Sequence, residues 1–124
     1  MATEEKVNPI ILHDLENKED YTLEFNRESV MFAEARGFDI EDVGRFPLTK
    51  VPELFFYAFR MHHKKMSRQQ TDHILFDVLK GLPEGAAERL GALYSVPFEA
   101  LNGKKNNEDN EGEALGNARM TVEL

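Results

Sequence analysis

The stretch "VPELFFYAFRMHHKKMSRQQ", residues 51–70, decides the fold, because its first half concentrates three Phe and one Tyr within five residues. Its apolar side chains follow the spacing 0, 3, 4, 7, 8 and 11, which is one face of an α-helix; they are Val51, Leu54, Phe55, Ala58, Phe59 and His62. We therefore predict a central core helix that begins near Thr49 or Lys50. Thr49 serves as its N-cap, and Pro52 falls in its first turn, where no N–H is needed.

The second half of this stretch carries two adjacent histidines, His62 and His63. Neighbouring residues on a helix point about 100° apart, so they do not chelate one metal ion as a pair spaced by four residues does. No Asp or Glu stands at a ligand spacing to either. We expect no metal site, with His62 packed partly on the core and His63 solvated. His73, on the next predicted helix, could approach either one.

Four cations, Arg60, Lys64, Lys65 and Arg68, form a basic cluster with no acid between them. One interpretation is a solvated helix end, where cations interact favourably with the helix dipole. The other is a positive patch that meets an acidic partner. A nucleic-acid site would pair such a patch with exposed aromatics, but the aromatics here stand at core spacing.

Towards the N-terminus the pattern changes to that of a β-hairpin. In "YTLEFN", residues 21–26, Tyr21, Leu23 and Phe25 alternate with polar residues, as in a half-buried strand. The polar stretch "ENKED", residues 16–20, is the predicted turn after a first strand in "NPIILHDL", residues 8–15. A helix then begins after Asn26 as N-cap and ends at Gly37, and a short helical turn comes next with Asp39 as its cap.

Towards the C-terminus, Ser67 and Gln70 fit a capping box. The next apolar residues continue at helical spacing up to a stop near Gly81; they are Thr71, Ile74, Leu75, Val78, Leu79 and Leu82. We predict a last helix from Pro83 to about Tyr94, ended by Pro97, with Phe98 and Leu101 as the final residues that dock on the core.

These elements predict an α+β fold that is mainly α: an N-terminal β-hairpin followed by about four helices. The globular domain spans residues 1–101, with a hairpin region at 1–26 and a helical region at 27–101. Residues 102–124 are rich in Asn, Gly and Glu and poor in apolar side chains, so we predict a flexible acidic tail.

Composition narrows the function. The 124 residues include no Cys and carry a formal net charge of −8, which excludes Cys-based chemistry and argues against binding nucleic acid. No signal peptide and no apolar run long enough to cross a membrane is expected, so we predict a soluble intracellular protein. No phosphate-binding loop and no grouping of Ser, His and Asp is found, and we expect neither catalysis nor a cofactor.

The order of segments resembles a family of small proteins from phages and prophages of Gram-positive bacteria. The resemblance is carried by "LEFNRESV", "ARGFDIEDV", "ELFFYAFRMHH" and "TDHIL", within residues 21–101, and by an acidic linker before a short apolar end, "ARMTVEL". Members of this family look like tail assembly chaperones of long-tailed phages. They are thought to bind the tape-measure protein, to help tail tube subunits polymerise around it, and to be absent from the mature virion.

The resemblance implies a non-enzymatic protein of the bacterial host cytoplasm, with the tape-measure protein and the tail tube protein as partners. It assigns no residue to binding. A chaperone for an apolar segment needs exposed apolar side chains, and Phe56, Tyr57 and Met61 lie off the main helical stripe. These three, with Arg60, Lys64, Lys65 and Arg68, are the candidate partner-binding residues, although the three could equally pack against the hairpin. The alternative is a small acidic phage-encoded regulatory or adaptor protein that binds a host protein.

Overall fold

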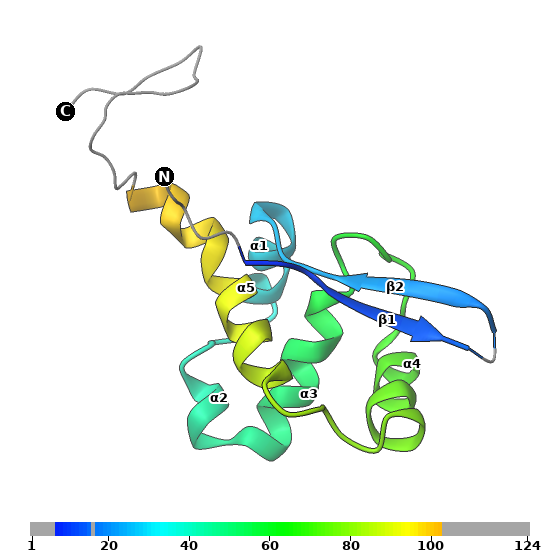
Figure 1. Ribbon diagram of the computed structural model, residues 1–124. Coiled ribbons are helices and arrows are strands. Elements are labelled where there is room, and N and C mark those ends of the chain that lie inside the picture. Colours follow the sequence, from blue (N-terminus) through cyan, green and yellow to red (C-terminus); the bar gives the residue numbers. More distant parts are fainter. Residues whose placement is uncertain (1–6, 16, 103–124) are drawn as a thin grey trace, which may run out of the picture.

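The computed structural model describes residues 7–15 and 17–102 (Figure 1). The elements are, in chain order, β1 (Ile10–Asp14), β2 (Glu19–Leu23), α1 (Arg27–Ala35), α2 (Asp42–Arg45), α3 (Pro47–Ala58), α4 (Arg68–Asp72), the π-helix η1 (His73–Val78) and α5 (Ala86–Asn102). The predicted class, an N-terminal hairpin followed by several helices, is confirmed. The predicted flexible tail lies outside the described residues except for Asn102, which ends α5.

The hairpin is antiparallel and pairs Ile10 with Leu23 and Leu12 with Tyr21. The predicted alternation holds, because Leu23 and Phe25 are buried while Thr22 and Glu24 are only partly covered. β2 ends at Leu23, earlier than predicted. There the chain leaves its partner strand, and the Glu24 N–H donates to the Ala58 carbonyl at 3.0 Å. This bond ties the hairpin to the end of α3.

Both ends of α1 follow the prediction. The Ser29 N–H donates to the Asn26 side chain at 2.8 Å, and the Asn26 N–H donates to the Ser29 hydroxyl at 2.9 Å, which is a reciprocal capping box. At the other end, the N–H groups of Gly37 and Phe38 bond to the carbonyls of Glu34 and Ala33. This Schellman motif requires a left-handed residue, and Gly37 supplies it with φ 86°.

The central helix α3 is present, but both predicted ends are wrong. It begins at Pro47, and the Phe46 carbonyl accepts from the N–H groups of Thr49 and Lys50, so Thr49 lies inside the helix. Pro52 therefore stands beyond the first turn. The helix ends at Ala58, where N–H groups bond three residues back and tighten the turn, as in Phe59 to Phe56 at 3.1 Å. His62 is consequently not on the helix.

The last helices also differ from the prediction. The capping box of Ser67 and Gln70 is confirmed, but the helix passes after Asp72 into η1. Helix α5 begins at Ala86 and runs through Pro97 to Asn102, so Pro97 does not end it. Leu101 is 80% exposed and does not dock, whereas Phe98 packs on Tyr94 with ring centroids 5.7 Å apart.

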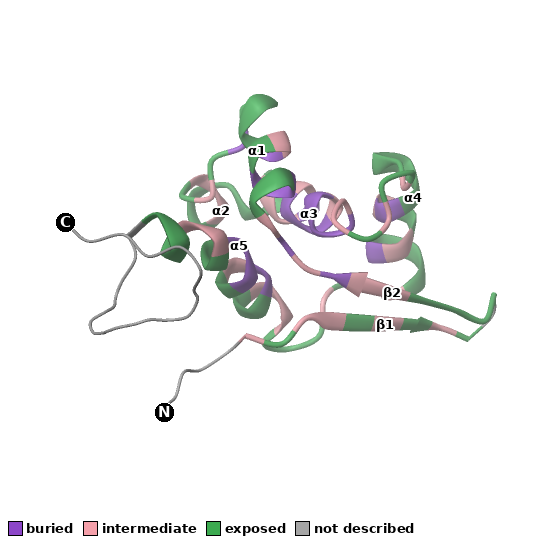
Figure 2. Cartoon of the chain, turned by 90° about the horizontal axis from the view of Figure 1, so that it is seen from above, coloured by how far each residue is buried: buried purple, intermediate pink, exposed green. Residues whose placement is uncertain are grey.

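The core surrounds α3, which contacts α1, α2, α4 and α5. Figure 2 shows buried residues concentrated on α3 and on the sides of α4 and α5 that face it. Phe25, Phe38 and Tyr94 meet edge to face at centroid distances of 5.0 and 5.6 Å, which joins the hairpin exit, the turn after α1, and α5. Among the described residues, no helix has both the length and the apolar character that a membrane span requires.

Candidate functional site

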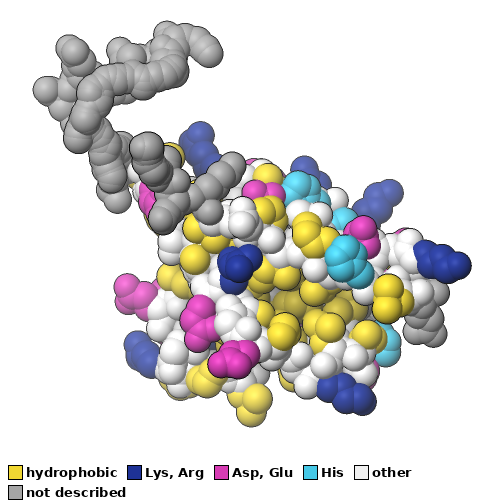
Figure 3. Space-filling view, viewed as in Figure 1, with side chains coloured by type: hydrophobic (Ala, Val, Ile, Leu, Met, Phe, Trp, Pro, Cys, Tyr) yellow, Lys and Arg dark blue, Asp and Glu magenta, His cyan; other side chains and the backbone are white. Residues whose placement is uncertain are grey.

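A groove of about 660 Å³ separates the hairpin from α4 and η1. Its apolar side chains come from both walls; they are Ile11, Leu12 and Tyr21 on the hairpin and Met66, Ile74, Val78 and Leu79 opposite. In Figure 3, hydrophobic side chains gather in a hollow beneath the hairpin. We call this feature the hairpin groove. Apolar side chains that remain open to solvent in a groove make it a candidate binding surface.

The π-helix shapes the lower wall of the groove. An α-helix would place Val78 on the same face as Leu75 and Thr71, which are both buried. In η1 the Leu79 N–H bonds to the Ile74 carbonyl, five residues back, at 2.8 Å. The extra residue in this turn rotates the positions after it around the helix axis, and Val78 is 58% exposed in the groove. Such π-turns occur frequently at functional sites.

Polar residues surround this apolar floor. On the hairpin, the His13 Nδ1 lies 2.8 Å from an Asp20 carboxylate oxygen, and the Asn17 amide donates to Asp14 at 2.9 Å. On η1, the His73 Nδ1 lies 3.0 Å from Asp77. The combination of an apolar centre and a polar rim is the usual anatomy of a protein-binding surface.

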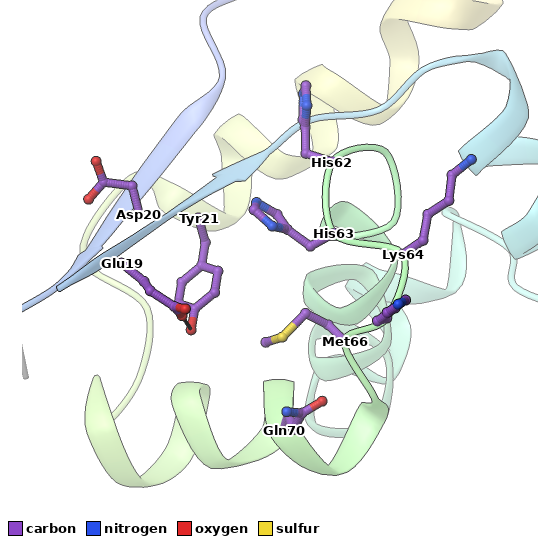
Figure 4. Close-up of a pocket in the computed structure, with 9 residues that line it drawn as sticks. Glu19, Asp20, Tyr21, His62, His63, Lys64, Met66 and Gln70 are labelled. Atoms are coloured by element: carbon purple, nitrogen blue, oxygen red, sulfur yellow. Dashed lines mark hydrogen bonds between the residues drawn. The ribbon is translucent and has the colours of Figure 1, made fainter. Parts of the chain in front are cut away.

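A second hollow of about 580 Å³ adjoins the hairpin groove and shares Tyr21, Met66 and Gln70 with it (Figure 4). We call it the histidine pocket; its lining is Glu19, Asp20, Tyr21, His62, His63, Lys64, Lys65, Met66 and Gln70. The Tyr21 hydroxyl donates to Glu19 at 2.7 Å. This hydrogen bond, with burial and the nearby carboxylates, raises the pKa of Tyr21 to about 12.

His63 holds the hairpin against the helical part of the chain. Its Nε2 accepts from the Thr22 N–H at 3.0 Å, and its ring meets Tyr21 edge-on at 5.4 Å. Burial, and then the neighbouring His62, lower the pKa of His63, which agrees with a ring nitrogen that must stay unprotonated to accept. The expectation for the two histidines was therefore reversed: His63 packs, and His62 is exposed and bonds to Glu24 at 2.9 Å.

No cluster of three or more potential metal ligands of the His, Cys, Asp or Glu type occurs within residues 7–15 and 17–102. His73, which the sequence allowed to approach His62 or His63, contacts Asp77 instead.

The candidate residues Phe56, Tyr57 and Met61 do not form a common exposed surface. Tyr57 is only 6% exposed, and its ring meets Phe38 at 5.3 Å and Phe32 at 6.0 Å. Phe56 and Met61 are partly buried. None of the three is among the residues that line the hairpin groove or the histidine pocket.

The basic cluster is divided by its contacts. The Arg60 guanidinium lies 3.9 Å from the centre of the Phe32 ring and 3.5 Å from a Glu28 oxygen, while its Nε is buried without a hydrogen-bond partner. Arg68 pairs with Asp72 at 2.9 Å. Lys64 and Lys65 are exposed and line the histidine pocket, although in Figure 4 the Lys64 side chain extends away from Tyr21 and Met66. The four cations are thus not one patch, because Glu28, which is distant in sequence, reaches Arg60, and Asp72, four residues further along the chain, pairs with Arg68.

Comparison with known proteins identifies the family. Residues 1–124 match the family described as "Domain of unknown function (DUF5055)", so the chain belongs to that family. No curated protein and no solved structure matches the chain.

Proposed function

We propose that this chain is a non-enzymatic tail assembly chaperone of a long-tailed phage. It binds segments of the tape-measure protein in the bacterial host cytoplasm and aids assembly of the tail tube. The hairpin groove is the observation that carries this proposal. The resemblance of the quoted segments to known chaperones supplies the identity of the client.

The groove has the properties that an apolar client requires. A client side chain that covers Val78 removes apolar surface from water, and each fully buried aliphatic side chain contributes about 1.5–3 kcal/mol before the costs of association. The polar rim gives the client backbone and flanking residues hydrogen-bonding partners. Each chain carries a net charge of −8, so copies of the complex repel one another. This repulsion suits a protein that holds an apolar chain in solution.

Co-expression with the tape-measure protein of the same phage genome tests the proposal. Unmodified chain should keep the tape-measure protein soluble. Val78→Asp should lower the soluble fraction about tenfold, because it puts a charge on the groove floor. Phe76→Asp is the matched control, because Phe76 is 51% exposed on the same π-helix but does not line the groove.

If both variants lower the soluble fraction of the tape-measure protein equally, or if Val78→Asp does not lower it, the groove is not the client site. If the tape-measure protein stays insoluble when it is co-expressed with the unmodified chain, the proposed chaperone function is wrong. The acidic regulatory or adaptor protein would then be the better hypothesis, and its gene should lie outside the tail operon.

A further inference from the structure

The two edges of the hairpin differ in what they contact. The N–H groups of Thr22 and Glu24 point away from β1, because they donate to the His63 ring and to the Ala58 carbonyl. This side of the hairpin therefore belongs to the contact with the helical part of the chain. In Figure 2, β2 lies between β1 and α3, so the outer edge of β1 lies on the side of the hairpin away from α3.

The outer edge of β1 offers backbone groups to a partner. β1 pairs with β2 one residue to one, and Ile11 stands opposite Thr22. Pairs in an antiparallel ladder alternate between bonded and non-bonded, and this pair is non-bonded, because the Thr22 N–H donates to His63. Ile11 and, two positions further on, His13 therefore direct their N–H and C=O groups outward. No residue in the described part of the chain pairs with this edge.

The sequence of β1 lacks the features by which edge strands usually avoid pairing. Such strands are blunted by charged side chains, above all Lys, by Pro, or by a bulge that interrupts the register. β1 reads IILHD, with no Lys or Pro and with its one carboxylate at the end. Its register with β2 is continuous from Ile10 to Asp14. The edge is therefore regular enough to pair with another strand.

The hairpin groove follows this edge. Its lining includes four consecutive residues of β1, 11–14. Side chains of consecutive residues alternate between the two faces of a strand, so a groove that all four border runs along the edge of the strand instead of along one face. Ile11 and His13 are exposed and lie on the outer face of this edge, whereas the partly buried Leu12 lies on the inner face with its partner Tyr21.

We infer that the hairpin groove binds its client as an extended segment, which adds a strand to the outer edge of β1. Ile11 and His13 each give this strand an N–H and a C=O to bond to. Successive side chains of the added strand alternate, so every second one lies beside Leu12 and faces Ile74 and Val78 across the groove. The inference deepens the proposed function, on which it rests, by stating how the groove holds a client.

The charges around the groove select the other side chains of the client. None of the described residues that line the groove is Lys or Arg, whereas Asp14 is among them. Two further carboxylates stand at the rim: Asp20 lies 2.8 Å from His13, and Asp77 lies 3.0 Å from His73. The whole chain carries a net charge of −8. A client strand in which Lys or Arg alternates with aliphatic residues therefore complements both the apolar wall and the acidic rim.

A helical client and a second copy of this chain fit these features less well. The backbone of a helix bonds within itself, so a helix would not bond to the outward groups of Ile11 and His13. A second copy would pair two β1 edges and bring together two chains that each carry a net charge of −8. An extended basic segment has neither disadvantage.

Binding of a synthetic peptide to the full chain tests the inference. The probe is a peptide of about nine residues in which Lys alternates with Val, which covers the length of one strand. The measurement is amide hydrogen exchange of the chain, followed by nuclear magnetic resonance. At a free peptide concentration of about ten times the Kd, the outward amides of Ile11 and His13 should exchange about tenfold more slowly. The Leu12 amide is the internal control, because it points to β2 and should keep its rate.

Modified peptides distinguish an added strand from any other bound form. A strand turns only every second amide to the edge it joins, so N-methylation of one alternate set of amides should abolish binding, and N-methylation of the other set should not. A peptide with the same composition, in which all Lys precede all Val, should bind at least about tenfold more weakly, because it loses the apolar face. A peptide with Glu in place of Lys should also bind at least about tenfold more weakly, because it is repelled by the acidic rim.

Substitution of Ile11 tests the edge from the side of the protein. Ile11→Pro removes one outward N–H and leaves the bonds between β1 and β2 in place, and Pro is tolerated where a strand N–H faces solvent. The Lys and Val peptide should bind about fivefold more weakly to this variant, as expected for one lost backbone hydrogen bond. Ile11→Val is the matched control, because it keeps the N–H. Both variants should keep the circular dichroism spectrum of the unmodified chain.

Equal binding of the two methylated peptides, or unchanged exchange of the Ile11 and His13 amides, would overturn the strand addition. Equal binding of the Lys and Glu peptides would overturn the assigned charge. Slower exchange that appears with rising protein concentration, without peptide, would replace the client by a second copy. The co-expression test fails separately: a tape-measure protein that stays insoluble refutes the named client and leaves a groove that binds an extended basic segment.

Discussion

Truncating Phe59 tests the core beneath the hairpin. Phe59 is 1% exposed, and its ring lies 5.1 Å from Phe55, 5.7 Å from Tyr21 and 6.2 Å from His63 between centroids. Replacing a buried Phe by Ala costs about 3–5 kcal/mol through lost transfer energy and the cavity left behind. The lost edge-to-face contacts favour the upper part of that range. We expect Phe59→Ala to lower the free energy of unfolding by about 4 kcal/mol, a large part of a typical total of about 5–15 kcal/mol.

Urea denaturation followed by far-ultraviolet circular dichroism measures this loss. With an m value of about 2 kcal/mol/M, the midpoint should fall by about 2 M. Phe76→Ala is the matched control, because it removes the same side chain from a position that is 51% exposed, and it should change stability by less than about 0.5 kcal/mol. Similar midpoints for Phe59→Ala and the unmodified chain would refute the assignment of this face to the core.

Single groups give three further predictions. The folded-state pKa of His63 lies below its ordinary value of 6.5, so the stability that its neutral ring contributes is complete above that pH and is lost on acidification. His63→Gln should therefore make the free energy of unfolding depend less on pH below 6.5, with His62→Gln as the control. An unchanged pH dependence in His63→Gln would contradict this prediction. The hydrogen bond to Glu19 raises the pKa of Tyr21 to about 12, and burial raises that of Tyr94 to about 12, so stability should fall between pH 10 and 12. Ultraviolet titration of Tyr21→Phe and Tyr94→Phe assigns the ionisation of each tyrosine. Ionisation of either tyrosine near pH 10 in the folded protein would contradict the prediction. Pro97→Ala should raise the free energy of unfolding by about 1–3 kcal/mol, because Pro inside a helix removes a backbone bond; a lower melting temperature would show that the ring contributes more through packing.

Local chemistry made the hairpin and the helix caps predictable. The capping boxes at Asn26 and Ser67 and the left-handed Gly37 depend on residues within a few positions of one another. Each belongs to a motif that satisfies backbone groups at a helix end, so the sequence pattern and the structure agree. The alternation around Leu23 is equally local, because it needs only a strand with one buried face.

The predictions at Pro52 and Pro97 were wrong, because packing there outweighs the backbone hydrogen bond that proline removes. Pro97 was expected to end the last helix, yet Tyr94 before it and Phe98 after it lie on the same packed side of α5, with rings 5.7 Å apart. Pro52 was expected near a helix start, but Pro47 takes that place and Pro52 is buried within α3. In both cases, burying the flanking side chains offsets the cost of one missing backbone bond.

The groove could not be derived from periodicity, because its lower wall depends on a change of period. Thr71, Leu75 and Val78 read as one face of an α-helix, and the first two are buried as that pattern requires. The π-turn then exposes Val78, and the only nearby sequence signal is Gly81, directly after the left-handed Lys80 at the end of the turn. The upper wall depends on Thr22 and His63, which are 41 positions apart and meet through one hydrogen bond. A surface built from an irregular turn and from long-range bonds such as this one has almost no local sequence signal, although each of its residues, taken alone, has an ordinary role.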